Sequence, residues 1–232
     1  MRKWIVPSLV VSALVAGLVS LSGAARADMV LNKVVIDFPG DKVPRDDIKI
    51  QNTGNDTLYV LVEPFQIINP GTDQQKREKI RDPGKSGLLV TPNRFVLQAK
   101  QTKVMRLVVL KPAEDKDRIY RLTVRPVVGK VKAEQTAVKI VVGYDVLVVV
   151  RPAKAEGNLQ AKRDGKKLTF TNTGQTSVLL SNGKNCDVNG ENCAELPPKR
   201  MYVGNEWSID LKHDTPAEYY VTVRDDILRK QF

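Results

Sequence analysis

Residue types that carry most enzyme chemistry are scarce in this sequence. Its 232 residues include one histidine, His213, and two cysteines. It has no glycine-rich phosphate-binding loop and no grouping of a nucleophile, a base and metal ligands. Neighbouring carboxylates such as Asp46 and Asp47, or Asp225 and Asp226, would face opposite sides of a strand. We therefore predict no catalytic residues, no cofactor and no metal site.

Long hydrophobic runs are lacking after the N-terminus. Arg2 and Lys3 precede an apolar stretch over 4–19, and small residues follow as far as Ala27, ending in an Ala-x-Ala cleavage signal. No later segment approaches the roughly 20 apolar residues that span a bilayer. We interpret residues 1–27 as a cleaved signal peptide, the alternative being a membrane anchor. The rest of the chain is expected to be exported, with no stable membrane insertion.

A dense basic run is also lacking. The formal net charge is +11, and removal of the signal peptide, with its three basic residues, would lower it to +8. Such a charge could attract nucleic acid, anionic lipid or acidic proteins. The basic residues are spread thinly from Lys33 to Lys230, and no motif that reads nucleic acid occurs. Together with export, this argues against a nucleic-acid partner.

The two cysteines, Cys186 and Cys193, lie close together in a turn-rich stretch with the sequence CDVNGENC. An even number of cysteines in an oxidising compartment is typical of disulfide-bonded proteins. We expect these two to form a disulfide that closes a short loop. The alternative is a pair of free thiols.

Helical periodicity is another absence. The chain consists of short runs rich in Val, Ile, Leu, Thr and Tyr, bounded by Gly, Pro, Asn and Asp. Many short strands with turns about 8–12 residues apart are typical of an all-β sandwich. The expected strands include 47–51, 57–68, 103–110, 118–128, 138–150, 168–171 and 218–223.

A break in this pattern lies at 151–157 (RPAKAEG), where Pro, Gly and small residues are typical of an interdomain linker. After this break the pattern of strands and turns starts a second time. Residues 48–62 and 168–180 each read as a strand, an Asn-Thr-Gly turn and a second strand. We therefore predict two related sandwiches in tandem, over 28–152 and 153–232.

The longest β run, 137–150, has two interpretations. In its first half Val138, Ile140 and Val142 alternate with other residues, whereas beyond Tyr144 both faces are apolar. A strand that is apolar on both faces is usually buried between layers. The alternative is an exposed edge that presents alternate side chains to a partner strand. Periodicity alone does not choose between these interpretations.

The order and spacing of several segments resemble the periplasmic pilus-assembly chaperones of the chaperone–usher pathway, the PapD-like family. The similar segments are 32–36, 88–107, 118–126 and 137–152, with a looser match over 168–180. The resemblance implies two immunoglobulin-like β-sandwich domains and a chaperone of pilus (fimbrial) subunits in a Gram-negative periplasm. It also implies an outer-membrane usher that receives the subunits.

The same resemblance implies a donor strand. Val138, Ile140 and Val142 match the alternating apolar side chains that fill a groove in an unfinished subunit, in donor-strand complementation. Burial of each could contribute about 1.5–3 kcal/mol before ordering costs. An exposed apolar edge of this kind would also favour self-association of the subunit-free protein.

In this family two basic residues anchor the subunit's C-terminal carboxylate. Lys33 matches the first position, where the family usually has Arg, and the exchange loses bidentate geometry. The second position, a Lys in the family, aligns with Leu147. We therefore expect Arg121 or Arg125, on the adjoining strand, to replace it, and Arg106 is a weaker candidate. The departure suggests a divergent branch of chaperones.

The alternative function is a structural one, as an immunoglobulin-like pilus subunit or adhesin. A subunit would usually be one incomplete domain with a free N-terminal donor arm. The two predicted domains and the internal position of the donor strand favour the chaperone.

Overall fold

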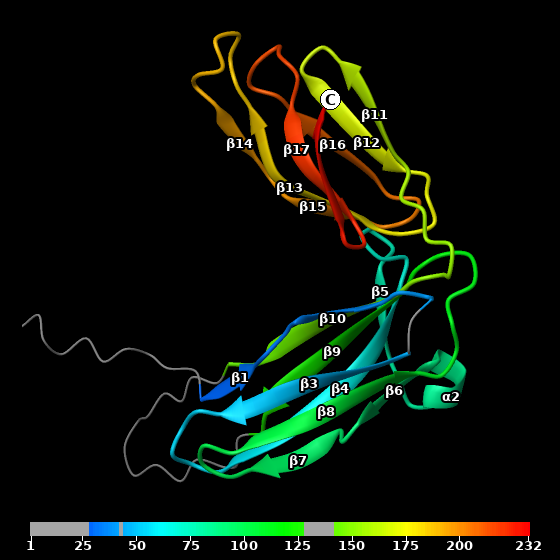
Figure 1. The fold of residues 1–232 in the computed structure, drawn as a ribbon, viewed down its shortest axis with the longest axis vertical. Coiled ribbons are helices and arrows are strands. Elements are labelled where there is room, and N and C mark those ends of the chain that lie inside the picture. The colour runs from blue at the N-terminus through cyan, green and yellow to red at the C-terminus, as the bar shows by residue number, and fades with distance from the viewer. Residues whose placement is uncertain (1–27, 42–43, 128–141) are drawn as a thin grey trace, which may run out of the picture.

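The computed structural model describes residues 28–41, 44–127 and 142–232. They form two β-sandwiches that meet at one end, with their bodies diverging from that junction (Figure 1). The one helix among these residues, α2 (Pro83–Ser86), is a single turn capped by the side chain of Asp82. No helix in the described ranges has the length and apolar character needed to cross a bilayer.

The first sandwich contains two sheets, with strand orders β1-β3-β8-β6 and β2-β10-β9-β4-β5, and β7 pairs with β4. The strands are β1 (Met29–Leu31), β2 (Val35–Phe38), β3 (Arg45–Asn52), β4 (Leu58–Ile68), β5 (Lys76–Lys79), β6 (Leu88–Thr91), β7 (Arg94–Leu97), β8 (Thr102–Val109), β9 (Arg118–Pro126) and β10 (Tyr144–Val150).

The second sandwich also has two sheets, β11-β12-β16 and β14-β13-β17-β18, with β15 paired to β13. Its strands are β11 (Leu159–Asp164), β12 (Lys167–Asn172), β13 (Val178–Asn185), β14 (Ala194–Leu196), β15 (Lys199–Met201), β16 (Glu206–Asp210), β17 (Glu218–Val223) and β18 (Asp226–Gln231). The strands stop at Val150 and resume at Leu159, on either side of the predicted domain boundary at 152/153. That boundary stays a prediction.

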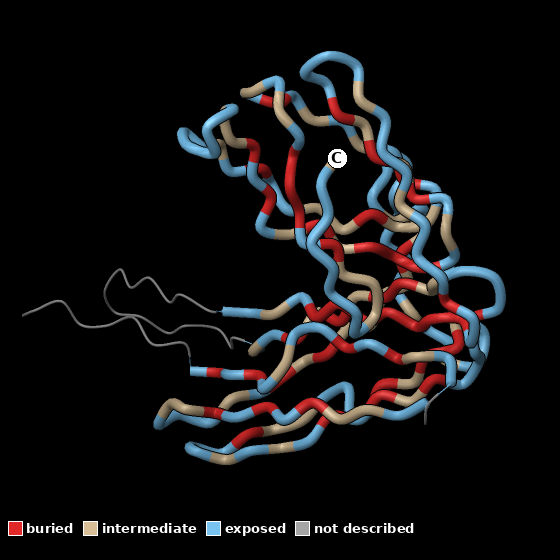
Figure 2. Tube along the Cα trace, turned by 45° about the horizontal axis from the view of Figure 1, so that its top comes forward, coloured by how far each residue is buried: buried red, intermediate tan, exposed pale blue. Residues whose placement is uncertain are grey.

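Alternation of apolar and polar residues builds each core, and Figure 2 shows buried and exposed residues alternating along the strands. In β3, for example, Ile48 and Ile50 are buried, whereas Lys49 is exposed. β10 differs because it is buried on both faces. Its even-numbered valines enter the first core, and Leu147 and Val149 join a second apolar cluster on the opposite face.

The two Asn-Thr-Gly segments fold alike, as the sequence repeat predicts. Asn52 is fully buried, and its amide nitrogen donates to the carbonyls of Asp56 and Leu97. Asn172 is fully buried too, and its amide nitrogen donates to the carbonyls of Thr176 and Met201. In each copy the Asn side-chain oxygen accepts from the glycine two residues on. A buried amide thus ties the turn to a strand in both sandwiches.

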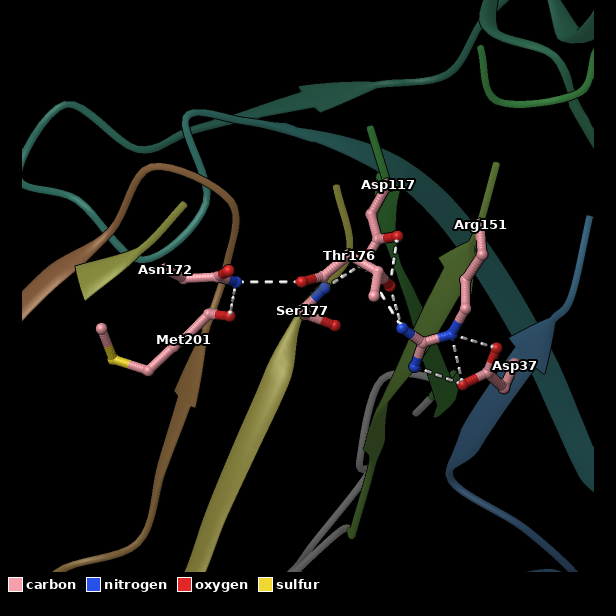
Figure 3. A network of polar contacts seen from close by, with 7 residues as sticks. All are labelled: Asp37, Asp117, Arg151, Asn172, Thr176, Ser177 and Met201. Atoms are coloured by element: carbon pink, nitrogen blue, oxygen red, sulfur yellow. Dashed lines mark hydrogen bonds and ion pairs between the residues drawn. The ribbon is translucent and has the colours of Figure 1, made fainter. Parts of the chain in front are cut away.

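Arg151, directly after β10, joins the two sandwiches (Figure 3). Its side chain is only 3% exposed. The guanidinium donates to Asp37 at 2.6–2.9 Å and also donates to the hydroxyl of Thr176 in the second sandwich. That hydroxyl donates to Asp117 at 2.8 Å, and the Ser177 amide donates to the same carboxylate at 2.7 Å. Buried charges need such complete pairing.

Burial raises the pKa of Asp117, although the Ser177 amide and the Arg151 charge oppose this change. Native Asp117 therefore retains its proton above pH 3.8, where the unfolded chain has lost it. Its contribution to the free energy of unfolding falls as pH rises through this window.

We expect Asp117→Asn to remove that pH dependence. Urea unfolding should show a smaller deficit in free energy of unfolding, relative to the parent protein, at about pH 7 than at about pH 4. A deficit that grows with pH would mean that folding lowers the pKa of Asp117, and would contradict this description of the junction.

Candidate functional site

One edge of β10 is open over part of its length. β9 pairs with the whole strand from Tyr144 to Val150, whereas β2 pairs with it in parallel only from Leu147 to Val150. The amide of Leu147 donates to Val34 and that of Arg151 donates to Phe38. By alternation, the N–H and C=O of Asp145 point to the same side. No strand among the described residues pairs with Asp145 there. We call this segment, 144–146, the open edge.

The predicted donor strand continues from this edge towards the N-terminus. Val142 lies two residues before β10 and is 44% exposed. Val138 and Ile140 lie outside the described residues, so the structure does not test their role. The second half of the predicted run can be compared with the structure. Its residues beyond Tyr144, which are apolar on both faces, form a buried strand, as their composition predicts.

Residues of β4 and β9, in the sheet that contains β10, line one wall of an interdomain cavity of about 680 Å³. Of its lining residues, Ile67, Ile119 and Tyr202 also pack in an apolar cluster with Leu147 and Val149 of β10, which lie outside the lining. The lining also includes Pro70 and Asn205, whose side-chain amide donates to the Pro70 carbonyl at 3.0 Å. The cavity is therefore lined by both domains and lies beside the apolar cluster that contains Leu147.

Leu147, which we predict to stand where the family has a lysine, is 6% exposed and belongs to this apolar cluster. Its cross-strand neighbours are Val35 on one side and Arg121 on the other. Arg121 is therefore the cation beside Leu147 in the ladder. Its guanidinium donates to the Asp145 carbonyl at 3.3 Å and lies 3.7 Å from the Asp145 carboxylate.

Arg77 reaches the same carboxylate from β5, across two intervening strands. It donates to both Asp145 oxygens, at 2.6 and 3.2 Å, and to the Thr123 hydroxyl at 2.5 Å. Its guanidinium lies over the Phe65 ring, 4.3 Å from the centroid. Sequence reasoning missed Arg77 because its partner is 68 residues away. The position of Asp145, two residues before Leu147, was readable from strand alternation.

Arg125, the other predicted replacement, pairs with Glu63 at 3.3 Å. The same carboxylate accepts a hydrogen bond from Lys79 at 2.5 Å. The hydrogen bond from Lys79, together with the charges of Lys79 and Arg125, lowers the pKa of Glu63. Arg121 and Arg125 thus share the outer face, each beside its own carboxylate.

Lys33 contacts the opposite sheet. Its ammonium group lies 2.5 Å from Asp46 of β3, and both side chains are 33% exposed. Arg106 of β8 also lies in that sheet and pairs with Asp47 at 2.8 Å. The acidic partners of these two cations therefore lie on a different sheet from those of Arg121 and Arg125.

The predicted disulfide is confirmed. Cys186 and Cys193 are bonded and close the loop between β13 and β14. Within the loop Asp187 accepts hydrogen bonds from the Asn192 side chain and from the Glu191 and Asn189 amides, which lower its pKa. The loop is thus held by both covalent and polar contacts.

A protein-family model described as "Pili and flagellar-assembly chaperone, PapD N-terminal domain" matches residues 28–156, more than half of the chain. The chain belongs to this chaperone family. The predicted resemblance is therefore confirmed. Because the family consists of assembly chaperones and not of enzymes, it also supports the prediction of a non-enzymatic protein.

Two curated relatives come from Escherichia coli, and both are named as fimbrial subunits. The relative from CS1 fimbriae is 25% identical over 196 residues, which cover 79% of this chain and 82% of the relative. The relative from CFA/I fimbriae is 25% identical over 193 residues, which cover 72% of this chain and 79% of the relative.

Two solved chaperone structures share the fold. The class 5 fimbriae chaperone CfaA has a TM-score of 0.64 at 19% identity, over 88% of this chain and 98% of that one. The SafB chaperone, solved with the SafA pilin of Salmonella enterica, has a TM-score of 0.64 at 14% identity, over 90% and 98%. The predicted all-β fold of two immunoglobulin-like domains in tandem is confirmed.

Proposed function

We propose that this protein is a periplasmic chaperone that binds pilus subunits by lending them a strand and delivers them to an outer-membrane usher. The observation that carries the proposal is the open edge of β10, where the backbone of Asp145 points away from β9. Backbone groups at such an edge bind an added strand through main-chain hydrogen bonds. Membership of the chaperone family supports this use of the edge.

In this proposal Val138, Ile140 and Val142 extend the same edge and insert into the groove of a subunit that lacks its last strand. Alternate side chains of a lent strand point to the same face and can fill consecutive pockets. The SafB chaperone, which has this fold, was solved in complex with the SafA pilin, and this supports a pilin as the partner. Each buried apolar side chain would contribute about 1.5–3 kcal/mol before ordering costs.

Lys33, Arg121 and Arg125 are the proposed anchors for the subunit's C-terminal carboxylate. Arg121 is the best placed, because it lies beside Leu147, at the level where β2 begins to pair with β10. A subunit strand parallel to β10 would end against β2 at this level. Lys33 must exchange Asp46 for the subunit's carboxylate, and Arg125 must exchange Glu63.

The location and the remaining partners follow from the same function. We propose that residues 1–27 direct export and are removed, and that the domains divide at 152/153. The usher would receive the loaded chaperone, and the subunit-free protein would cover its donor strand by self-association. The alternative, a structural subunit or adhesin, is not favoured by the family match.

Replacing Ile140 with Asp should abolish subunit capture, because a carboxylate would enter an apolar pocket. Loss of an apolar contact and burial of a charge together predict at least about a hundredfold weaker binding. The measurement is co-purification of the pilus subunit from periplasm, where the parent protein should give a one-to-one complex. Lys139→Asp, at the neighbouring position that faces the opposite side, is the matched control and should retain capture. Normal capture by Ile140→Asp would show that the donor strand lies elsewhere.

Replacing Lys33 with Ala should weaken capture about two- to fivefold, the range expected for one partly exposed charge contact. Calorimetric titration with the purified subunit measures the change. Lys49→Ala removes an exposed lysine from β3 and should leave the affinity unaltered. Equal affinities of the Lys33→Ala variant and the parent would exclude Lys33 as an anchor.

A further inference from the structure

We propose that Arg77 and Arg121 form a binding site for a carboxylate of the pilus subunit, and that Asp145 occupies this site in the free protein. The inference rests on the proposed function and goes beyond it, because it identifies Arg77 as a ligand-binding residue and Asp145 as an internal competitor. The structure already shows a carboxylate bound there, held in bidentate fashion by Arg77 and approached by Arg121. This is the geometry in which arginine recognises carboxylates.

Arg77 is held in position by groups other than Asp145. The Thr123 hydroxyl accepts a hydrogen bond from its guanidinium, and the Phe65 ring lies beneath it at 4.3 Å. A cation over an aromatic face is held by electrostatic attraction to the ring. Arg77 therefore stays oriented when Asp145 leaves, so an incoming carboxylate meets a site that is already arranged.

The positive charge of the two arginines exceeds the negative charge of Asp145, so a second carboxylate could be bound. Two guanidinium groups share the one carboxylate of Asp145, and the contact of Arg121 with it is the longer, at 3.7 Å. The side chains of Arg77, Arg121 and Asp145 are 38%, 34% and 45% exposed. Ion pairs with this exposure contribute little to stability, so an exchange of one carboxylate for another costs little. Displaced Asp145 would remain in contact with water.

The site lies where an added strand would end. Asp145 belongs to the open edge, and its carbonyl, which points to that side, accepts a hydrogen bond from Arg121. A subunit strand bound at this edge therefore reaches the Arg121 guanidinium and the Asp145 side chain together. Covering them with the subunit would lower the local dielectric and strengthen the pairing of both arginines with the new carboxylate.

The carboxylate could be the C-terminus of the subunit or one of its acidic side chains. Two synthetic copies of the C-terminal segment of the co-purifying subunit separate these sources, one ending in a free carboxylate and the other in an amide. Their dissociation constants are measured with the full-length mature protein and with three variants: Asp145→Asn, Arg77→Gln and Arg121→Gln.

We expect the parent protein to prefer the free acid. Asp145→Asn should tighten binding of the acid about threefold, which is the scale of an exposed ion pair, and leave the amide unaltered. Arg77→Gln and Arg121→Gln should each reduce the preference for the acid. Equal tightening of both peptides by Asp145→Asn would support the site with a side-chain carboxylate as its ligand.

Asp214→Asn is the matched control, because Asp214 also pairs with an arginine, Arg163 at 3.0 Å, but lies in the second sandwich, away from the open edge. It should leave both dissociation constants unaltered, and circular dichroism should show every variant folded. Weaker or unaltered acid binding by Asp145→Asn would overturn the competitor role. Arginine variants that both bind the two peptides as the parent protein does would overturn the site. If the parent protein bound neither peptide, both the carboxylate site and the proposed function would be wrong.

Discussion

The buried guanidinium of Arg151 is the contact on which the rest of the structure depends. It follows the last residue of β10, pairs with Asp37 at the end of β2, and donates to Thr176 in the second sandwich. Burial acts to lower the pKa of Arg151, but its hydrogen bond and charge interaction with Asp37, together with nearby Asp117, give a net increase. A charge this deeply buried is stable only while all of its partners stay in place.

This junction determines the geometry of the proposed site. One end of β10 is fixed by Arg151 and the other end leads to the open edge, so a single strand connects the domain interface to the surface that would bind a pilin. The short pairing with β2 stops at Leu147 and leaves Asp145 without a strand on that side in the described part of the chain. The length of β2 therefore sets where strand addition could begin.

Local sequence patterns predicted the features that depend on neighbouring residues. The β-rich composition, the Asn-Thr-Gly repeat and the two-faced apolar character of β10 all correspond to observed structure, because alternation and turn chemistry act over a few residues. The disulfide was equally accessible from the spacing of Cys186 and Cys193.

Contacts between distant strands could not be predicted in this way. The pairing of Lys33 with Asp46 and of Arg77 with Asp145 depends on sheet order and register, and a shift of one residue would turn each side chain to the other face. The alignment of Leu147 with the family's lysine stays a prediction, and the burial of Leu147 is compatible with an apolar residue there. Its place in the apolar cluster with Ile67 and Ile119 would not suit a charge.

Backbone hydrogen exchange, measured on the free protein and on its complex with a pilus subunit, tests the central claim that subunits pair with the open edge. We predict that the Asp145 amide and the amides of residues 138–143 gain protection on binding. The amides of β18, the edge strand of the second sandwich, should exchange at unaltered rates. Protection confined to β18, with Asp145 exchanging as in the free protein, would contradict this claim.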